Sequence, residues 1–590
     1  MTPIDLSRRQ MLAVVPSALA ATGLGGAFAA APQRSDAAGT ATPKEPAPAS
    51  AAGAAAPADP TAFLDRRSPV FTRRCIASSS SPMATQVGFR VLAEGGNACD
   101  AVLAMAGMMG VVEPMMSGLG GDTMVLVWSA KDRKVHGLNG SGIAPSGASL
   151  DRVPAGPFVP EHGPMSVTIP GAFDGWCALH ARFGSKPLAT LWEPAVAAAR
   201  EGVPIGESIA GVWSLMAPEM KSYLSPELMA LLLPAGKAPV PGQLVRFPAL
   251  ADTMERVALG GRESFYAGPV AQAIADTLTA GGVPTTLDDL ARQRAQWVEP
   301  IAARYRGRDV LQLPPNSQGV VTVQALGILD GFDLAAMSPA DRMHHEIEAL
   351  RLAFAFAIDE VGEPTDAMME KVQRALTPAG LAEARARITD RALPLGRPVG
   401  GNSGDTTFMC AIDAEGNMVS LMSSISGVFG SGLLAGGTGI ILNNRAAQFS
   451  AKRDSPNALA AGKRPRHTIL PGMVLRDGQP EFLMGCVGAN NHPQGQVQGL
   501  VNVLDLGMTT QQAMDAPRFR IVMTNDQVQL DAAIPQDVQR DLAARGHALG
   551  DPKAFKGAAQ MVRIHRGEAG IGPCLESGVD HRLDGVALGW

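Results

Sequence analysis

The 590-residue chain lacks any dense block of basic residues: 50 Lys and Arg residues face 55 Asp and Glu residues, for a formal net charge of −5. Nucleic-acid binding is therefore not expected, because phosphate neutralisation needs clustered Lys and Arg. Aromatic residues make up only 5%, whereas 66 Gly and 45 Pro residues are present. This composition indicates a soluble protein with many tight turns and close backbone approaches.

Several common catalytic motifs are also missing. No G-x-S-x-G occurs, which disfavours an α/β-hydrolase, and Gly118–Gly121 lacks the spacing of a P-loop or dinucleotide motif. His345-Glu346 begins like H-E-x-x-H without a second His, so we expect this pair on an exposed helix face. The six cysteines lack C-x-x-C spacing, which predicts mostly buried thiols and no metal site; they are Cys75, Cys99, Cys177, Cys410, Cys486 and Cys574.

The amino-terminal segment resembles an export signal. Arg8-Arg9 precedes an apolar, Ala-rich run that ends near residue 30, which is typical of a twin-arginine signal and predicts a periplasmic or secreted protein. A retained anchor helix is the alternative. Residues 31–62 have the composition of a low-complexity linker, and we expect the ordered region to begin near Phe63. No later segment is long and apolar enough to span a bilayer.

A polar, glycine-rich stretch up to residue 405 is followed by a predicted β-hairpin. A strand begins at Thr406, a turn covers residues 413–417, and a second strand returns. Pairing Ile412 with Met418 places Thr406 opposite Ser424, where Cβ atoms lie about 4.5–5.5 Å apart. Two hydroxyl groups are thus predicted to face each other, either as a catalytic pair or as an ordinary structural pair at a strand end.

Short motifs recur in a fixed order from about Cys75 to Trp590. They are Gly95-Gly96-Asn97-Ala98 with Asp100-Ala101, Gly118-Leu119-Gly120-Gly121, Ile169-Pro170-Gly171, Tyr305-Arg306-Gly307 with Pro314-Pro315, Asp405-Thr406-Thr407, Gly430-Ser431-Gly432, Gly439-Ile440-Ile441-Leu442-Asn443-Asn444, Lys463-Arg464-Pro465, Ala516-Pro517-Arg518-Phe519 and Asp580-His581-Arg582. This succession resembles the γ-glutamyltranspeptidase (γ-glutamyltransferase) family of N-terminal-nucleophile hydrolases. The resemblance implies an α+β fold, a four-layer αββα sandwich, built jointly by a large chain (63–405) and a small chain (406–590), with no cofactor.

The resemblance also implies a self-cleaving precursor. The Thr406 hydroxyl would attack the carbonyl of Asp405, and the released amine of Thr406 would then serve as base for its own hydroxyl. Ser424 matches the residue that tunes the nucleophile, and the N–H groups of Gly488 and Ala489 match the oxyanion donors. Ala489 stands where the family has glycine; alanine keeps the N–H but does not favour a positive φ.

Six candidate substrate-binding residues depart from the family pattern: Ser141, Ser426, Arg445, Gln448, His467 and Thr468. Ser141 replaces an arginine that holds the substrate α-carboxylate, and Arg445 and Gln448 stand where acidic residues hold the α-ammonium. The local charge is therefore reversed, and Arg445 would repel an ammonium and could bind a carboxylate. A purely structural ion pair of Arg445 is the alternative.

These features predict a divergent γ-glutamyltransferase-like enzyme, similar to the branch that includes oxamate-type amidohydrolases. It would cleave a small-molecule amide, γ-glutamyl or another carboxylate-bearing acyl compound, by hydrolysis or by transfer to an amine or peptide. An uncleaved, non-catalytic binding protein of the same fold is the competing hypothesis. The oligomeric state stays open, a dimer of the two-chain unit included.

Overall fold

The computed structural model describes residues 67–156, 158–394, 404, 406–551, 557–567 and 570–590. The predicted export signal (1–30), the linker (31–62) and Asp405 lie outside the described residues. Within the described residues, none of the helices combines the length and the apolar character needed to cross a membrane.

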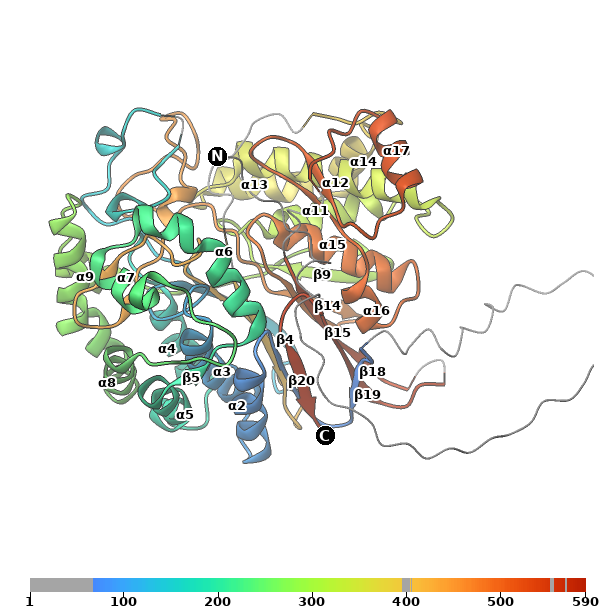
Figure 1. The fold of residues 1–590 in the computed structure, drawn as a ribbon. Helices are drawn as coiled ribbons and strands as arrows, with labels where there is room; N and C mark the ends of the chain where they lie inside the picture. Colours follow the sequence, from blue (N-terminus) through green and yellow to red (C-terminus); the bar gives the residue numbers. More distant parts are fainter. Residues whose placement is uncertain (1–66, 157, 395–403, 405, 552–556, 568–569) are drawn as a thin grey trace, which may run out of the picture. The chain divides into compact units, whose positions relative to one another are not determined.

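Two seven-stranded antiparallel sheets form the centre of the fold (Figure 1). The first sheet has the order β20 (Val586–Gly589), β2 (Ile76–Ser79), β10 (Thr407–Ile412), β11 (Met418–Ser424), β3 (Asp122–Ser129), β4 (Lys134–Gly140) and β7 (Gln296–Val298). The second has the order β1 (Val70–Thr72), β19 (Cys574–Val579), β18 (Ala559–His565), β15 (Gln479–Cys486), β14 (Gly472–Arg476), β9 (Arg308–Gln312) and β8 (Ile301–Tyr305). Three two-stranded ribbons are β5 (Val203–Pro204) with β6 (Leu244–Val245), β12 (Leu434–Ala435) with β13 (Ile440–Ile441), and β16 (Phe519–Ile521) with β17 (Val528–Leu530).

Helices cover the outer face of each sheet. On the side of the first sheet lie α2 (Pro82–Ala93), α3 (Ala98–Val112), α4 (Ala172–Phe183), α5 (Leu188–Glu201), α6 (Glu207–Tyr223), α7 (Pro226–Leu232), α8 (Pro248–Tyr266), α9 (Pro269–Ala280) and α10 (Leu287–Arg292). On the side of the second lie α11 (Gly319–Leu329), α12 (Pro339–Glu360), α13 (Asp366–Ala375), α14 (Pro378–Arg385), α15 (Asn491–Leu504), α16 (Thr510–Asp515) and α17 (Gln536–Ala544). The predicted α+β, four-layer αββα sandwich is confirmed.

The alternation of side chains along the hairpin explains how its residues divide between layers. Phe408, Cys410 and Ile412 join the core between the two sheets, whereas Met409 and Ala411 pack toward the helices. Apolar residues on both faces of β10 are needed because the strand is covered on both sides.

The predicted hairpin register is confirmed. Ile412 pairs with Met418, and the ladder continues to Thr407 opposite Ser423. On the other side of β11, Ser424 pairs with Asp122 of β3. The hairpin that follows residue 405 therefore lies between β2 and β3, so that segments from both sides of the predicted cut form one sheet.

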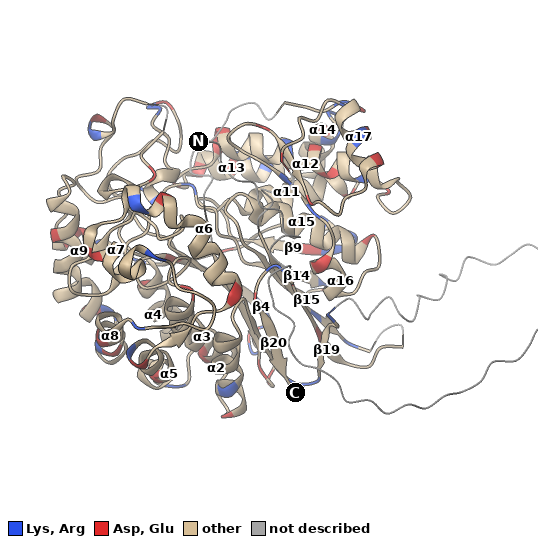
Figure 2. Ribbon diagram, in the orientation of Figure 1, with Lys and Arg blue, Asp and Glu red and all other residues tan. Residues whose placement is uncertain are grey.

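Charged residues of both signs are spread over the outer helices, as Figure 2 shows. One expectation about them is wrong: Glu346 is buried rather than exposed, and this burial raises the pKa of Glu346 to about 8. His345 is half-buried. The expectation for the thiols is confirmed, since all six are unpaired and four of them are buried.

Candidate active site

The two predicted hydroxyl groups meet at the end of the hairpin. Thr406 Oγ1 donates a hydrogen bond to Ser424 Oγ at 3.3 Å, and the Ser426 N–H donates to the same Ser424 oxygen at 2.9 Å. All three residues are buried. Ser426 has φ of 80°, so the chain turns sharply after β11 and brings its backbone N–H back to Ser424.

The predicted oxyanion loop joins β15 to α15 and lies against the segment before Thr406. A Cβ atom added to Gly404 would lie 2.7 Å from Ala489 Cβ and 3.2 Å from the Ser426 carbonyl oxygen. Gly488 and Ala489 have φ of 106° and 54°. Ala489 therefore has the positive φ that alanine does not favour. For a residue with a Cβ atom this backbone conformation costs about 1–2 kcal/mol of free energy.

A buried carboxylate, Asp122, organises the floor beside these hydroxyls. Its Oδ2 atom accepts hydrogen bonds from Arg445 Nε at 3.2 Å and His467 Nε2 at 2.9 Å, and its Oδ1 atom accepts from the Gly142 N–H at 2.8 Å. Asp122, Arg445 and His467 are fully buried. Asp122 of β3 pairs with Ser424 of β11, so only β11 separates this cluster from the strand that follows Thr406.

Arg445 forms a structural ion pair with Asp122, which was the alternative considered for it. One nitrogen of its guanidinium nevertheless stays available for a further hydrogen bond. Nη1 donates to Thr468 Oγ1 at 2.8 Å, whereas Nη2 has no partner among the residues that the structure describes. Burial lowers the pKa of Arg445 to about 10, against the opposing effect of Asp122, so the side chain stays charged at neutral pH. A buried donor without an acceptor costs about 1–3 kcal/mol, which an incoming acceptor would recover.

His467 is a neutral hydrogen-bond donor in this cluster. The Ile469 N–H points at its Nδ1 atom at 3.3 Å, so Nδ1 carries no proton and Nε2–H donates to Asp122. Burial, reinforced by the charge of Arg445, lowers the pKa of His467 to about 4. Its contact with Asp122 is therefore a hydrogen bond rather than an ion pair near neutral pH.

The other predicted binding residues lie around the same cluster. The Ser141 hydroxyl donates to Asn139 Oδ1 at 2.6 Å and accepts from Asn316 Nδ2 at 3.3 Å, so it is engaged within the protein. Gln448 ends a short 3₁₀ helix that begins at Arg445. The structure thus gathers Ser424, Ser426, Arg445, His467 and Thr468 near Asp122, and places Ser141 beside Gly142, which also binds Asp122.

Two residues that sequence reasoning missed hold this arrangement together. Asp122 lies on the inter-sheet face of β3, two residues before Met124; strand alternation could have assigned it to that face, but not to its partner Ser424. Asn443 Oδ1 accepts from the Thr168 N–H and from the Arg445 N–H, at 3.1 and 3.0 Å. Arg445 is thereby fixed through both its backbone and its side chain.

Two clusters of side chains within the described residues are compact enough to hold a metal ion, and neither contains a residue of this site. They are His344 with Glu348 and His547, and Asp515 with Asp580 and His581.

The chain matches known proteins over most of its length. The family model described as Gamma-glutamyltranspeptidase matches residues 84–590. A glutathione hydrolase-like YwrD proenzyme of Bacillus subtilis is 33% identical over 89% of this chain and 99% of its own length. An oxamate amidohydrolase proenzyme of Klebsiella pneumoniae is 32% identical over 86% of this chain and 97% of its own.

The fold comparison agrees with this assignment. The crystal structure of a cephalosporin acylase from Bacillus halodurans superposes with a TM-score of 0.83 at 35% identity, covering 90% of this chain and 99% of that one. Together these similarities support an amide-bond hydrolase or acyltransferase activity.

The lowered pKa of His467 makes a prediction about acid stability. Because the folded pKa (about 4) lies below the ordinary value of 6.5, this group stabilises the fold fully above pH 6.5 and loses that contribution as the pH falls toward 4. His467→Gln keeps a donor for Asp122 but does not titrate. Between pH 7 and 4.5 we expect it to lose roughly 2 kcal/mol less unfolding free energy than wild type in urea titrations. Equal losses in both proteins would contradict this account.

Proposed function

Because the chain belongs to the gamma-glutamyltranspeptidase family, we propose that it is a self-processing amide hydrolase or acyltransferase that works through a Thr406 acyl-enzyme. The observation that carries the proposal is the contact of Thr406 Oγ1 with Ser424 Oγ at 3.3 Å, with Gly404 packed against Ala489. The nucleophile, its partner and the candidate oxyanion loop are then close to the bond to be cut.

In the processing step, Thr406 Oγ attacks the Asp405 carbonyl carbon. The peptide C–N bond breaks as an ester C–O bond forms, and the hydroxyl proton passes to the freed amine. Water then hydrolyses the ester and leaves a carboxylate on Asp405. The products are a large chain that ends at residue 405 and a small chain that begins at Thr406.

In the catalytic step, the new α-amine of Thr406 accepts the proton of its own hydroxyl as Oγ attacks the carbonyl carbon of the substrate amide. The substrate C–N bond then breaks, and the leaving amine takes that proton and departs. Free α-amines have a pKa of about 7.7–8.0, so a useful neutral fraction exists near neutral pH. The N–H groups of Gly488 and Ala489 stabilise the oxyanion, each by a factor of about 10²–10³ in rate by analogy with other oxyanion holes. Water, or an amine or peptide acceptor, then takes the acyl group from Thr406.

The charge of the site favours a carboxylate-bearing acyl group without an ammonium. Arg445 offers Nη2 as an unused donor, whereas the Asp122 carboxylate is already engaged by Arg445, His467 and Gly142. None of the other predicted substrate-binding residues is acidic. An α-ammonium would therefore meet the cation of Arg445, while the Asp122 carboxylate beside it is already paired.

The location of the enzyme is part of the proposal. The twin-arginine-like segment at residues 7–30 supports export to the periplasm or beyond the cell. Detection of the two chains in a periplasmic or culture fraction, and their loss after Arg8→Lys with Arg9→Lys, would test it.

Thr406→Ala is expected to abolish both processing and turnover, because the nucleophile is removed. The matched control is Thr407→Val, which changes the adjacent threonine whose hydroxyl only donates to the Ser423 carbonyl at 3.2 Å. Denaturing gels should show one chain for Thr406→Ala and two chains for Thr407→Val, and amide turnover should fall by a factor on the order of 10³ or more only in the first. Two chains from Thr406→Ala would exclude Thr406 as the nucleophile and favour a different cleavage site; one chain from wild type would favour the inert binding protein.

Gly404→Ala is expected to slow self-cleavage about tenfold, because the new Cβ atom would lie 2.7 Å from Ala489 Cβ. The double variant Gly404→Ala with Ala489→Gly removes the clash and should recover the rate. A time course of chain separation after synthesis measures both. Normal processing of Gly404→Ala, or no recovery in the double variant, would show that this contact does not shape the precursor.

Three p-nitroanilides with the same leaving group distinguish the acyl donors: γ-glutamyl, glutaryl (no ammonium) and butyryl (no ammonium and no carboxylate). We expect kcat/KM for the glutaryl compound to exceed both others by about tenfold or more, because it alone offers the unpaired donor of Arg445 a carboxylate without an accompanying ammonium. Turnover of the γ-glutamyl compound at an equal or higher rate would contradict the proposed specificity and leave the Thr406 mechanism intact.

A further inference from the structure

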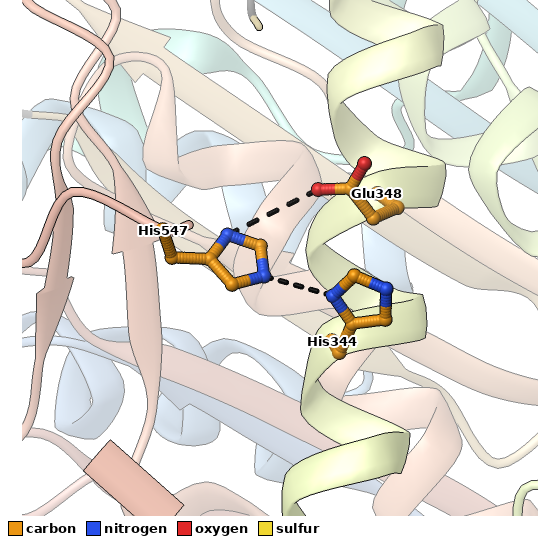
Figure 3. Close-up of side chains that lie close together, drawn as sticks. All are labelled: His344, Glu348 and His547. Atoms are coloured by element: carbon orange, nitrogen blue, oxygen red, sulfur yellow. Dashed lines mark hydrogen bonds and ion pairs between the residues drawn. The ribbon is translucent and has the colours of Figure 1, made fainter. Parts of the chain in front are cut away.

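A second buried polar cluster lies far along the chain from Thr406, where α12 meets His547, three residues after the end of α17 (Figure 3). His344 and Glu348 stand one turn apart on α12, and His547 faces both. His344 Nδ1 lies 2.9 Å from His547 Nε2, and His547 Nδ1 lies 3.9 Å from Glu348 Oε1. All three side chains are buried.

The hydrogen bonds determine which ring nitrogens of the two histidines carry a proton. His344 Nε2 must donate, because its partner at 2.7 Å is the Thr389 carbonyl oxygen. In a neutral imidazole Nδ1 is then an acceptor, so the proton between the rings belongs to His547 Nε2. His547 Nδ1 is left bare and accepts from Arg351 Nη1 at 3.4 Å.

This arrangement of protons does not favour a metal centre, although two imidazoles and a carboxylate lie close together. His547 Nε2 is bound to His344 and His547 Nδ1 to Arg351, so a metal ion would have to break one of these hydrogen bonds. The place of a cation beside Glu348 is also occupied, since Arg351 Nη1 lies 3.2 Å from Glu348 Oε1. A divalent ion would have to displace a buried guanidinium.

The cluster instead forms hydrogen bonds with backbone groups of Thr389 and Leu393. The Leu393 N–H donates to Glu348 Oε2 at 2.7 Å, and the Leu393 carbonyl accepts from Arg351 Nη1 at 2.6 Å. His344 holds the Thr389 carbonyl in the same way. Three side chains of α12 thus bind three backbone groups within five residues.

The other side of the same segment contacts the last residue of α17 and the residue after it. The Ala392 N–H donates to the Arg545 carbonyl at 3.0 Å, and Arg391 Nη1 donates to the Ala544 carbonyl at 2.7 Å. His547 then links these residues to His344. Residues 389–393 are therefore held between α12 and the chain from 544 to 547.

We propose that His344, Glu348 and Arg351 of α12, together with His547 of the small chain, form a metal-free clamp that holds residues 389–393, near the end of the large chain, against the small chain. The assignment of the two sides to different chains rests on the proposed cut between residues 405 and 406. The clamp ties the chains together outside the two sheets. It binds backbone groups of Thr389, Ala392 and Leu393, and Arg391 adds a side-chain hydrogen bond. Its residues are positioning residues and take no part in the chemistry at Thr406.

Hydrogen exchange of the processed protein tests the clamp. In wild type the Ala392 and Leu393 amides should exchange at least about 100-fold more slowly than free amides. His547→Ala should accelerate them about tenfold or more, because the bond to His344 is lost. His547→Gln retains a donor at the position of Nε2 and should stay within about twofold of wild type. Amides of β10 should be unchanged in both variants.

Several outcomes would overturn the clamp. They are unprotected Ala392 and Leu393 amides in wild type, unchanged exchange in His547→Ala, acceleration that spreads equally to β10, and one equivalent of metal bound in wild type and lost in His547→Ala, measured by elemental analysis. A protein that stays a single chain would contradict the proposed function, whereas an unprotected segment in a processed protein would contradict the clamp alone.

Discussion

The buried carboxylate of Asp122 is the constraint on which the candidate site depends, because a charge without water must be compensated where it lies. Three donors surround it, and each comes from a different part of the chain: Gly142, Arg445 and His467. Arg445 is held in turn by Asn443 and Thr468. Loss of any of these hydrogen bonds would leave the buried carboxylate or the buried guanidinium without one of its partners. Substrate recognition and folding are therefore coupled here.

Close backbone approach connects this cluster to the nucleophile. A Cβ atom on Gly121 would lie 2.4 Å from the Ser424 carbonyl oxygen, and one on Gly120 would lie 2.0 Å from the Ile441 carbonyl oxygen. The Gly120-Gly121 pair therefore has a steric role: it lets the turn before β3 approach β11 and the loop that leads to Arg445. This explains physically why a glycine-rich motif that fits no nucleotide-binding pattern precedes Asp122.

Features that depend on neighbouring residues in the sequence were predicted most accurately. The hairpin register followed from alternation and turn length, and it placed Thr406 beside Ser424 correctly because a slip of one residue would move Phe408 out of the core. The buried character of α3 followed from its apolar residues on every side. The family motifs extended these local predictions to the four-layer fold.

The same local rules could not predict contacts between residues that lie far apart in the chain. Arg445 and Asp122 are 323 residues apart in the chain, and no spacing predicts that they meet. Glu346 was expected on an exposed face because charge usually marks the solvent side of a helix, yet tertiary packing buries it. Ala489 shows a third limit: its positive φ is a strained conformation that neighbouring residues maintain, which propensity alone disfavours.

The central claim is that Thr406 becomes an amino-terminal nucleophile that carries the acyl group. Mass spectrometry of the small chain, quenched in acid during turnover of a carboxylate-bearing amide, tests this most directly. The account predicts a chain that begins at Thr406 and gains the mass of the acyl group on its amino-terminal peptide. A small chain that begins elsewhere, or an acyl group found on another residue, would contradict it.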